Sequence, residues 1–132
     1  MVAVDQPDDA LASVRRLSPD LHAWVGDAVY ELYVRTSLAV SGEGLPGDLH
    51  QKAVAQVRAE AQAAAMHRLW PELSASELEI VKRARNRTGA GSHRGDPAVV
   101  HMSTAFEALL GYLYLTGQWR RLSELLQKAA KT

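Results

Sequence analysis

The most apolar stretch of the chain contains one charged side chain. Residues 103–117 read STAFEALLGYLYLTG, and Glu107 is the only acid or base among these fifteen residues that is charged at neutral pH. Removing an unpaired carboxylate from water costs several kcal/mol, as for any buried ion. A fold that buries this stretch must therefore give Glu107 a proton, a cation or a metal.

A second acid follows a glycine inside an apolar helical pattern. In AWVGDAVYELYVR, Asp27 comes directly after Gly26, although an interior glycine costs a helix about 1 kcal/mol relative to alanine. Gly111 follows Glu107 by about one helical turn in the same way. The two glycines predict that their helices approach closely and bring Asp27 and Glu107 together.

Length and composition limit the class of protein. A chain of 132 residues is long enough to bury a core, and we expect one domain over residues 1–132. Fifteen basic and fifteen acidic residues give no net charge, so a polyanion must be met by a local patch. The absence of cysteine excludes disulfides and fits a reducing compartment, the cytoplasm. The acidic start and the lack of a long uncharged run predict neither a signal peptide nor a membrane span.

The hydrophobic pattern predicts an all-α fold of about six helices. Apolar residues recur at helical spacing almost throughout, and no segment alternates as a half-buried strand does. The expected helices run from Ser18 and Pro19 to about Gly42, from Asp48 through an alanine-rich stretch to just before Pro71, from a capping box of Ser74 and Glu77 toward Asn86, through Glu107, and from about Trp119.

The first long helix is apolar on nearly every side. Its apolar stripe consists of Leu21, Trp24, Val25, Ala28, Val29 and Leu32. Asp27 lies on another side with Asp20 and Glu31, an arrangement also typical of a solvated surface. Tyr30 and Val34 share that side, so we expect a central helix.

Two interpretations of the acids stay open at this point. Asp27 on a solvated face and Glu107 as an ion-paired core residue would be structural. Two acids on two closely packed helices instead favour a divalent cation such as Mg²⁺, which prefers carboxylate oxygens and often binds through one or two of them.

Four segments, in this order, resemble Mini-ribonuclease III, the compact relative of ribonuclease III. They are GDAVYELYVR at 26–35, DLHQK at 48–52, KRARN at 82–86 and STAFEALLGYLYL at 103–115. The resemblance implies a ribonuclease III-like endonuclease that forms a symmetric homodimer and cuts double-stranded RNA with Mg²⁺, or alternatively Mn²⁺. It implies a role in maturation of the 23S ribosomal RNA precursor, with neither DNA nor a membrane as partner. The family's catalytic and metal-binding acids correspond to Asp27 and Glu107.

Two positions differ from the signature of the larger ribonuclease III enzymes. That signature has a Glu four residues before the aspartate and an Asp three residues before the late glutamate, where this chain has Ala23 and Thr104. Mini-ribonuclease III lacks these acids too. Asp20 falls where the larger enzymes have a further Glu, but position alone does not make it a ligand. The number of metal ions stays open.

Residues 82–94 hold the clearest concentration of positive charge. They contain five basic residues and no acid. A charge run is often merely solvated, but this one precedes the Glu107 helix and includes two glycines that would let the backbone follow a groove. Double-stranded RNA is recognised mainly through phosphates and 2′-hydroxyls. The residues predicted to bind RNA are Lys82, Arg83, Arg85, Asn86, Arg87 and Arg94.

Cutting both strands of a duplex requires two sites, which favours a two-fold dimer. We expect its interface on the exposed apolar side of the first long helix, around Trp24 and Ala28. The five histidines show no helical pair of zinc ligands. The alternative hypothesis is a non-catalytic helical module that binds structured RNA or a protein, with Asp27 and Glu107 ion-paired to Arg35 or Arg58.

Overall fold

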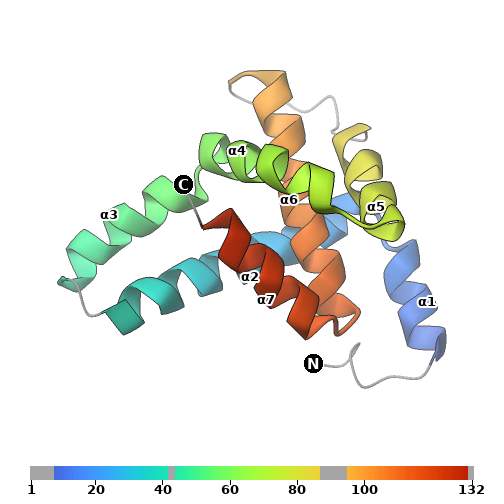
Figure 1. Ribbon diagram of the computed structural model, residues 1–132, viewed down its shortest axis with the longest axis horizontal. Helices are drawn as coiled ribbons and strands as arrows, with labels where there is room; N and C mark the ends of the chain where they lie inside the picture. The colour runs from blue at the N-terminus through green and yellow to red at the C-terminus, as the bar shows by residue number, and fades with distance from the viewer. Residues whose placement is uncertain (1–7, 42–43, 87–94, 131–132) are drawn as a thin grey trace.

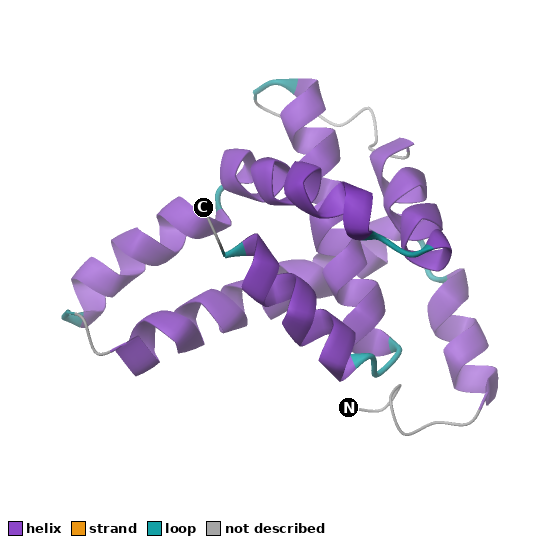
Figure 2. Ribbon diagram, in the orientation of Figure 1, coloured by secondary structure: helices purple, strands orange, loops and turns teal. Residues whose placement is uncertain are grey.

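The fold is built from helices alone throughout residues 8–41, 44–86 and 95–130, the part of the chain that the computed structural model describes (Figures 1 and 2). The elements are α1 (Asp8–Arg16), α2 (Pro19–Ser41), α3 (Pro46–Val57), α4 (Ala59–Leu69), the short 3₁₀ helix η2 (Trp70–Glu72), α5 (Ala75–Asn86), α6 (Pro97–Leu115) and α7 (Trp119–Ala129). The all-α prediction is confirmed, with seven α-helices in these ranges rather than about six.

Helix α6 is the centre of the packing. It contacts α2, α4 and α5 most extensively, and Figure 1 shows it running behind α4 and α7 and across α2. Phe106, Leu109, Leu110 and Leu113 on α6 have no solvent exposure. The helix is long and apolar enough to cross a membrane by length and composition, but half of that span is buried against the neighbouring helices. Its apolar character is that of a core helix.

Two glycines allow α2 and α6 to touch through their backbones. A Cβ atom on Gly26 would lie 1.6 Å from the backbone oxygen of Glu107, and one on Gly111 would lie 1.8 Å from the backbone oxygen of His22. Real Cβ atoms do not approach that closely, so only glycine fits at either position. The predicted close approach of the two helices is confirmed.

Two predicted helix starts are also confirmed. Ser74 and Glu77 form the capping box, in which the Ser74 backbone donates to the Glu77 carboxylate at 2.9 Å and the Glu77 backbone donates to the Ser74 hydroxyl at 3.2 Å. Ser18 Oγ accepts a 3.3 Å hydrogen bond from the Leu21 backbone at the start of α2. The capping residues are therefore visible in the sequence and do what it indicates.

The predicted single helix from Asp48 to Trp70 is wrong. The helix begins at Pro46, so Asp48 lies in its first turn and is not the cap, and the chain breaks at Arg58, whose ψ is 155°. Gln62 Nε2 donates to the carbonyl oxygen of Val57 at 2.7 Å, which satisfies a group that the break exposes. The break lets α3 pack on α2 while α4 packs on α6.

Helix α1 has no counterpart among the predicted helices. Its Val14 is buried, and the Val14 carbonyl accepts a 2.8 Å hydrogen bond from His22 Nε2. His22 is fully buried, and this burial lowers its pKa. The neutral imidazole therefore ties α1 to α2.

Candidate active site

The glycine contact places Asp27 and Glu107 next to each other. Asp27 follows the glycine that packs on the Glu107 backbone, and its side chain is exposed, whereas Glu107 is half-buried. Burial is the largest cause that raises the pKa of the Glu107 carboxyl, and a hydrogen bond and charge from Asp27 raise it further, to about 8. Two carboxyl groups on different helices thus share one small volume.

Neither acid is neutralised by a basic side chain within the described ranges of the chain. Arg35 instead pairs with Glu31 on the surface of α2, at 2.7 Å. Arg58 is exposed at the break before α4 and forms no ion pair with Asp27 or Glu107 in the described residues. The described residues therefore contain neither of the ion pairs that the non-catalytic hypothesis expects, which would join Arg35 or Arg58 to Asp27 or Glu107.

Gln62 on α4 is a third member of the site that the sequence did not indicate. Its side chain hydrogen-bonds with Glu107 and opposes the rise in the Glu107 pKa. It lies in an alanine-rich stretch whose pattern signals only a helix, so nothing local marks it as functional.

These residues fit a hard divalent cation. Burial is the main cause of the raised Glu107 pKa, and the charge of Asp27 adds to it. A cation between the two carboxylates would offset both effects, and Mg²⁺ commonly binds through one or two carboxylates while keeping several waters. Among the described residues no group of three His, Cys, Asp or Glu side chains surrounds a common point. Within the described residues, Asp27 and Glu107 are therefore the two carboxylates that could hold a cation at this place.

The surrounding positions agree with a sparse site. The two positions where the larger enzymes carry further acids hold a buried Ala23 and a half-buried Thr104. Neither side chain has a carboxylate to offer a cation. Asp20 is exposed about two turns before Asp27 on α2.

Known proteins are similar to this chain in both sequence and fold. Its residues 22–118 match the Ribonuclease III domain family. Mini-ribonuclease 3 of Symbiobacterium thermophilum is 49% identical over 121 residues, which cover 91% of this chain and 93% of that protein. The chain belongs to the Mini-ribonuclease III family. Mini-ribonuclease 3 of Synechocystis sp. is 47% identical over 91% of this chain and 82% of its own length.

A solved structure confirms the fold assigned to this Mini-ribonuclease III family member. The crystal structure of a Fusobacterium nucleatum protein superposes with a TM-score of 0.78 and covers 86% of this chain and 92% of that one. Its sequence identity is 24%, so the likeness concerns the fold.

The residues of the segment predicted to bind RNA fall into three groups. Lys82, Arg83 and Asn86 are exposed at the end of α5. Arg85 is half-buried, with its guanidinium 5.4 Å from the centre of the Trp70 ring and its Nε bonded to Asn86 Oδ1 at 3.2 Å. Arg85 thus also contributes to packing. The predictions for Arg87 and Arg94 lie outside the described residues.

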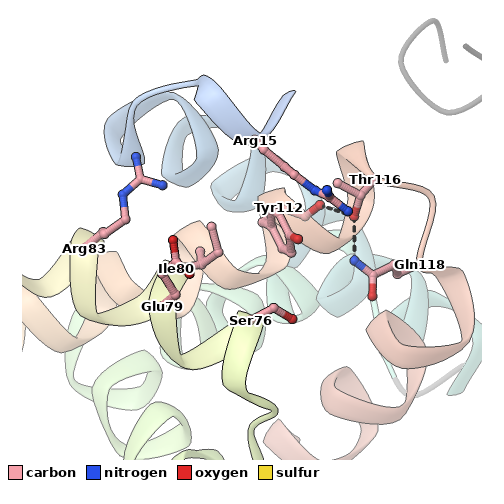
Figure 3. A pocket seen from close by; sticks show the side chains of 8 residues that line it. All are labelled: Arg15, Ser76, Glu79, Ile80, Arg83, Tyr112, Thr116 and Gln118. Atoms are coloured by element: carbon pink, nitrogen blue, oxygen red, sulfur yellow. Dashed lines mark hydrogen bonds between the residues drawn. The ribbon is translucent and has the colours of Figure 1, made fainter. Parts of the chain in front are cut away.

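Arg83 faces a pocket of about 470 Å³ between α1, α5 and the end of α6. Figure 3 shows Arg83 and Arg15 on different sides of this pocket, with Glu79 and Tyr112 also lining it. Tyr112 follows Glu107 by five residues, about 140° around α6. The pocket therefore opens on a different side of α6 from the paired acids. Arg15 was missed because α1 was missed.

An uncovered apolar face lies along α2 and α7. Trp24 is 75% exposed and Leu32 is 68% exposed, while Ala28 lies between them on the same side of α2 and is also exposed. Ala28 and Leu32 line a groove of about 400 Å³ with Tyr114 and side chains of α7. The opposite side of α2 carries the buried Tyr30 and Val34, as predicted for a central helix.

Proposed function

We propose that this protein is a divalent-metal-dependent endoribonuclease that cuts double-stranded RNA, acting in the cytoplasm on the 23S ribosomal RNA precursor. The observation that carries the proposal is the pair of carboxyl groups, Asp27 and Glu107, held together by a backbone contact between α2 and α6. Membership of the Mini-ribonuclease III family makes RNA the substrate that this pair would act on.

Asp27 and Glu107 would hold Mg²⁺ or Mn²⁺. The cation, when bound, would supply activation of water for in-line attack and stabilisation of charge on the leaving 3′ oxygen, which leaves 5′-phosphate products. The rigid contact of α2 with α6 fixes the separation of the two carboxylates before substrate arrives. The exposed Asp27 presents its carboxylate to the solvent side of the site, where a phosphodiester would approach.

Substrate binding would rest on the exposed end of α5. Lys82 and Arg83 offer cationic groups free of ion pairs within the described residues, and Asn86 adds an amide. Contacts of this kind to phosphates carry little sequence information, which suits a substrate read by its shape. The chain has no net charge, so this local patch would supply most of the salt-dependent affinity.

The second strand calls for a second copy of the chain. The apolar face around Trp24, Ala28 and Leu32 is the surface of α2 that its own fold leaves uncovered, and the groove beside α7 continues it. Burial of exposed apolar side chains such as these drives association. A two-fold dimer through this face would carry one pair of acids for each strand of the duplex.

The decisive experiment compares Asp27→Asn and Glu107→Gln with Glu60→Gln, which neutralises an exposed acid on α4. In Mg²⁺, the first two variants should lose cleavage of a long RNA duplex by at least about 100-fold, while binding and circular dichroism spectra stay close to wild type. Glu60→Gln should cut normally. Near wild-type cleavage by either of the first two variants, or wild-type cleavage that survives EDTA, would overturn the proposal. Tight duplex binding without any wild-type cleavage would favour a non-catalytic RNA-binding module.

A further inference from the structure

The pocket between α1, α5 and the end of α6 is lined by polar side chains that lack partners. Arg15 on α1 and Arg83 on α5 form no ion pair and no hydrogen bond with any described residue. Tyr112 is 5% exposed, and its hydroxyl, on the lining of the pocket, has no hydrogen-bond partner within the described ranges. Guanidinium groups and a phenolic hydroxyl are all donors. The pocket therefore offers a ligand both positive charge and hydrogen-bond donors.

The α1 side of this pocket is held against α2 and α6. Val14, the residue before Arg15, is buried, and its carbonyl oxygen accepts a 2.8 Å hydrogen bond from His22 Nε2. The His22 ring packs edge-on against the Tyr112 ring, with the ring centroids 5.8 Å apart. The backbone that carries Arg15 is therefore tied through His22 to Tyr112, so both sides of the pocket are in place before a ligand arrives.

The size and the charges of the pocket fit one nucleotide of a single strand. A volume of about 470 Å³ lies in the range of pockets that hold small molecules, and it is far smaller than a duplex. Figure 3 shows Arg15 and Arg83 on different sides of the pocket. A nucleotide within a strand has a phosphate on either side of its ribose, whereas a nucleoside monophosphate has one. Glu79 also lines the pocket and can accept a hydrogen bond from a ribose 2′-hydroxyl.

The pocket adjoins the end of α5 to which the proposed function assigns RNA binding. Arg83 lines it, and Lys82 and Asn86 are exposed at the same end of the helix. Because the pocket opens on a different side of α6 from the paired acids, its ligand is not the phosphodiester that is cut. A single strand that leaves the duplex is flexible enough to turn from α5 toward α1.

We propose that this pocket binds a nucleotide of a single strand that flanks the duplex, with the two phosphates of that nucleotide meeting Arg15 and Arg83 and the Tyr112 hydroxyl donating to one of them. The inference rests on the proposed function, because it takes RNA as the ligand, and it extends the substrate to a duplex with a single-stranded flank. Basic groups that follow a single-stranded backbone bind with little sequence preference and lose affinity as salt rises.

The test compares a short blunt RNA duplex with the same duplex carrying single-stranded adenosine tails. Both are bound to the Asp27→Asn chain, so that neither is cut, and fluorescence anisotropy gives the Kd over a range of salt concentrations. The tails should lower the Kd by about 2- to 5-fold, as expected of exposed charge pairs. Adding Arg15→Ala should remove most of this gain and reduce the salt slope for the tailed duplex by about 0.7, the value for one phosphate of a single strand. The Kd for the blunt duplex should not change.

Two further variants control for charge and for the hydroxyl. Arg16 is an exposed basic neighbour on α1 that does not line the pocket, so Arg16→Ala should keep the gain from the tails. Tyr112→Phe removes the hydroxyl and keeps the ring against His22, and it should lose part of the gain. An equal loss in Arg15→Ala and Arg16→Ala would overturn the inference, because it would show general attraction to the surface. Tyr112→Phe with the full gain would remove the hydroxyl from the site.

The alternative source of the same chemistry is a free nucleotide. If adenosine 5′-monophosphate binds the Asp27→Asn chain and loses affinity in Arg15→Ala, while the tails add nothing, the pocket takes a free nucleotide and the inference is wrong. Tails that add nothing and no binding of adenosine 5′-monophosphate would overturn it as well.

Failure of the inference is distinguishable from failure of the proposed function. Cleavage of the blunt duplex by wild type, lost in Asp27→Asn, tests the function without the pocket. Such cleavage together with tails that add no affinity would leave the function standing and remove the role of the pocket. A wild type that binds neither RNA would remove both.

Discussion

Gly26 packs against the backbone carbonyl of Glu107, and a Cβ atom at Gly26 would lie 1.6 Å from that oxygen. Asp27 is the next residue. The contact that packs α2 on α6 therefore also sets the separation of the two acids. One glycine therefore serves both the packing of the two helices and the placement of the two acids, and its cost to helix stability is about 1 kcal/mol.

Substituting either contact glycine should damage stability and activity together. Gly26→Ala and Gly111→Ala each place a Cβ within 2 Å of a backbone oxygen, so the helices must move apart, at a cost of at least about 1–3 kcal/mol for an overpacked core. Urea denaturation measures this loss, and duplex cleavage measures the displaced acids. Gly47→Ala is the control, because Gly47 lies in α3 with nothing within 4 Å of its added Cβ. It should gain up to about 1 kcal/mol. Equal effects at Gly26 and Gly47 would contradict the packing argument.

The raised pKa of Glu107 predicts a pH-dependent stability in the absence of metal. The folded Glu107 carboxyl keeps its proton up to its pKa of about 8, whereas the ordinary pKa of a glutamate side chain is 4.5, so between these pH values the folded state binds more protons than the unfolded state. The contribution of Glu107 to the free energy of unfolding is fully present below about pH 4.5 and is lost as pH rises through 8. The free energy of unfolding should therefore fall across this window more in wild type than in Glu107→Gln, which does not titrate. Added Mg²⁺ should reduce the difference, since metal binding needs the ionised carboxylate. If the free energy of unfolding changed with pH in the same way in both proteins, the raised pKa of Glu107 would be refuted.

The sequence predicts those features that depend on one residue and its close neighbours. The Ser74 and Glu77 capping box, the start of α2 at Ser18 and the glycine pair could be found because their chemistry is local or sterically unique. Asp27 and Glu107 were found because a charged group in an apolar stretch demands a partner. Their roles in metal binding stay predictions.

The features that the sequence misses depend on tertiary contacts. The break at Arg58 falls in an alanine-rich segment without glycine or proline, and it is stabilised by Gln62 reaching back to Val57. Helix α1 is held by a buried histidine that binds its backbone. Neither partner is identifiable before the fold is known. The position of Gln62 beside Glu107 escapes sequence analysis for the same reason.

The buried ion pair between α5 and α7 should be a main source of stability. Arg121 Nε and Nη2 donate to the two oxygens of Glu77, both at 2.9 Å, and the Glu77 side chain is only 5% exposed. Although burial alone would raise it, the hydrogen bonds from Arg121 and Ser74 hold the pKa of Glu77 below its usual range. Arg121→Ala leaves this buried carboxylate without its cationic partner and should lower the free energy of unfolding by about 3–5 kcal/mol. Arg120→Ala removes an exposed neighbour and should cost little. Thermal and urea denaturation of the two variants give the comparison, and similar values would contradict it.

The exposed end of α5 should account for part of the salt dependence of RNA binding. In an Asp27→Asn background, where the duplex stays uncut, Lys82→Ala and Arg83→Ala should each weaken binding to duplexes of any sequence. Each should reduce the slope of log affinity against log salt by about one. Arg120→Ala serves as the control, since it removes an exposed charge at the start of α7. An unchanged slope in the Lys82→Ala, Arg83→Ala double variant would identify the segment as solvated surface.

The apolar face of α2 should hold two copies of the chain together. Trp24 and Leu32 are large, exposed and on one side of the helix, next to the groove lined by α7, so a charge placed there would be desolvated in a dimer at a cost of several kcal/mol. Sedimentation of wild type should give twice the chain mass of 14.4 kDa, while Trp24→Asp should give the monomer. Val54→Asp changes an exposed apolar residue on α3, outside the groove, and should leave the dimer intact. Because each copy would carry one pair of acids, the monomer should nick one strand and lose paired cuts across the duplex. A wild-type protein that is a monomer and still severs both strands would contradict this role of the α2 face.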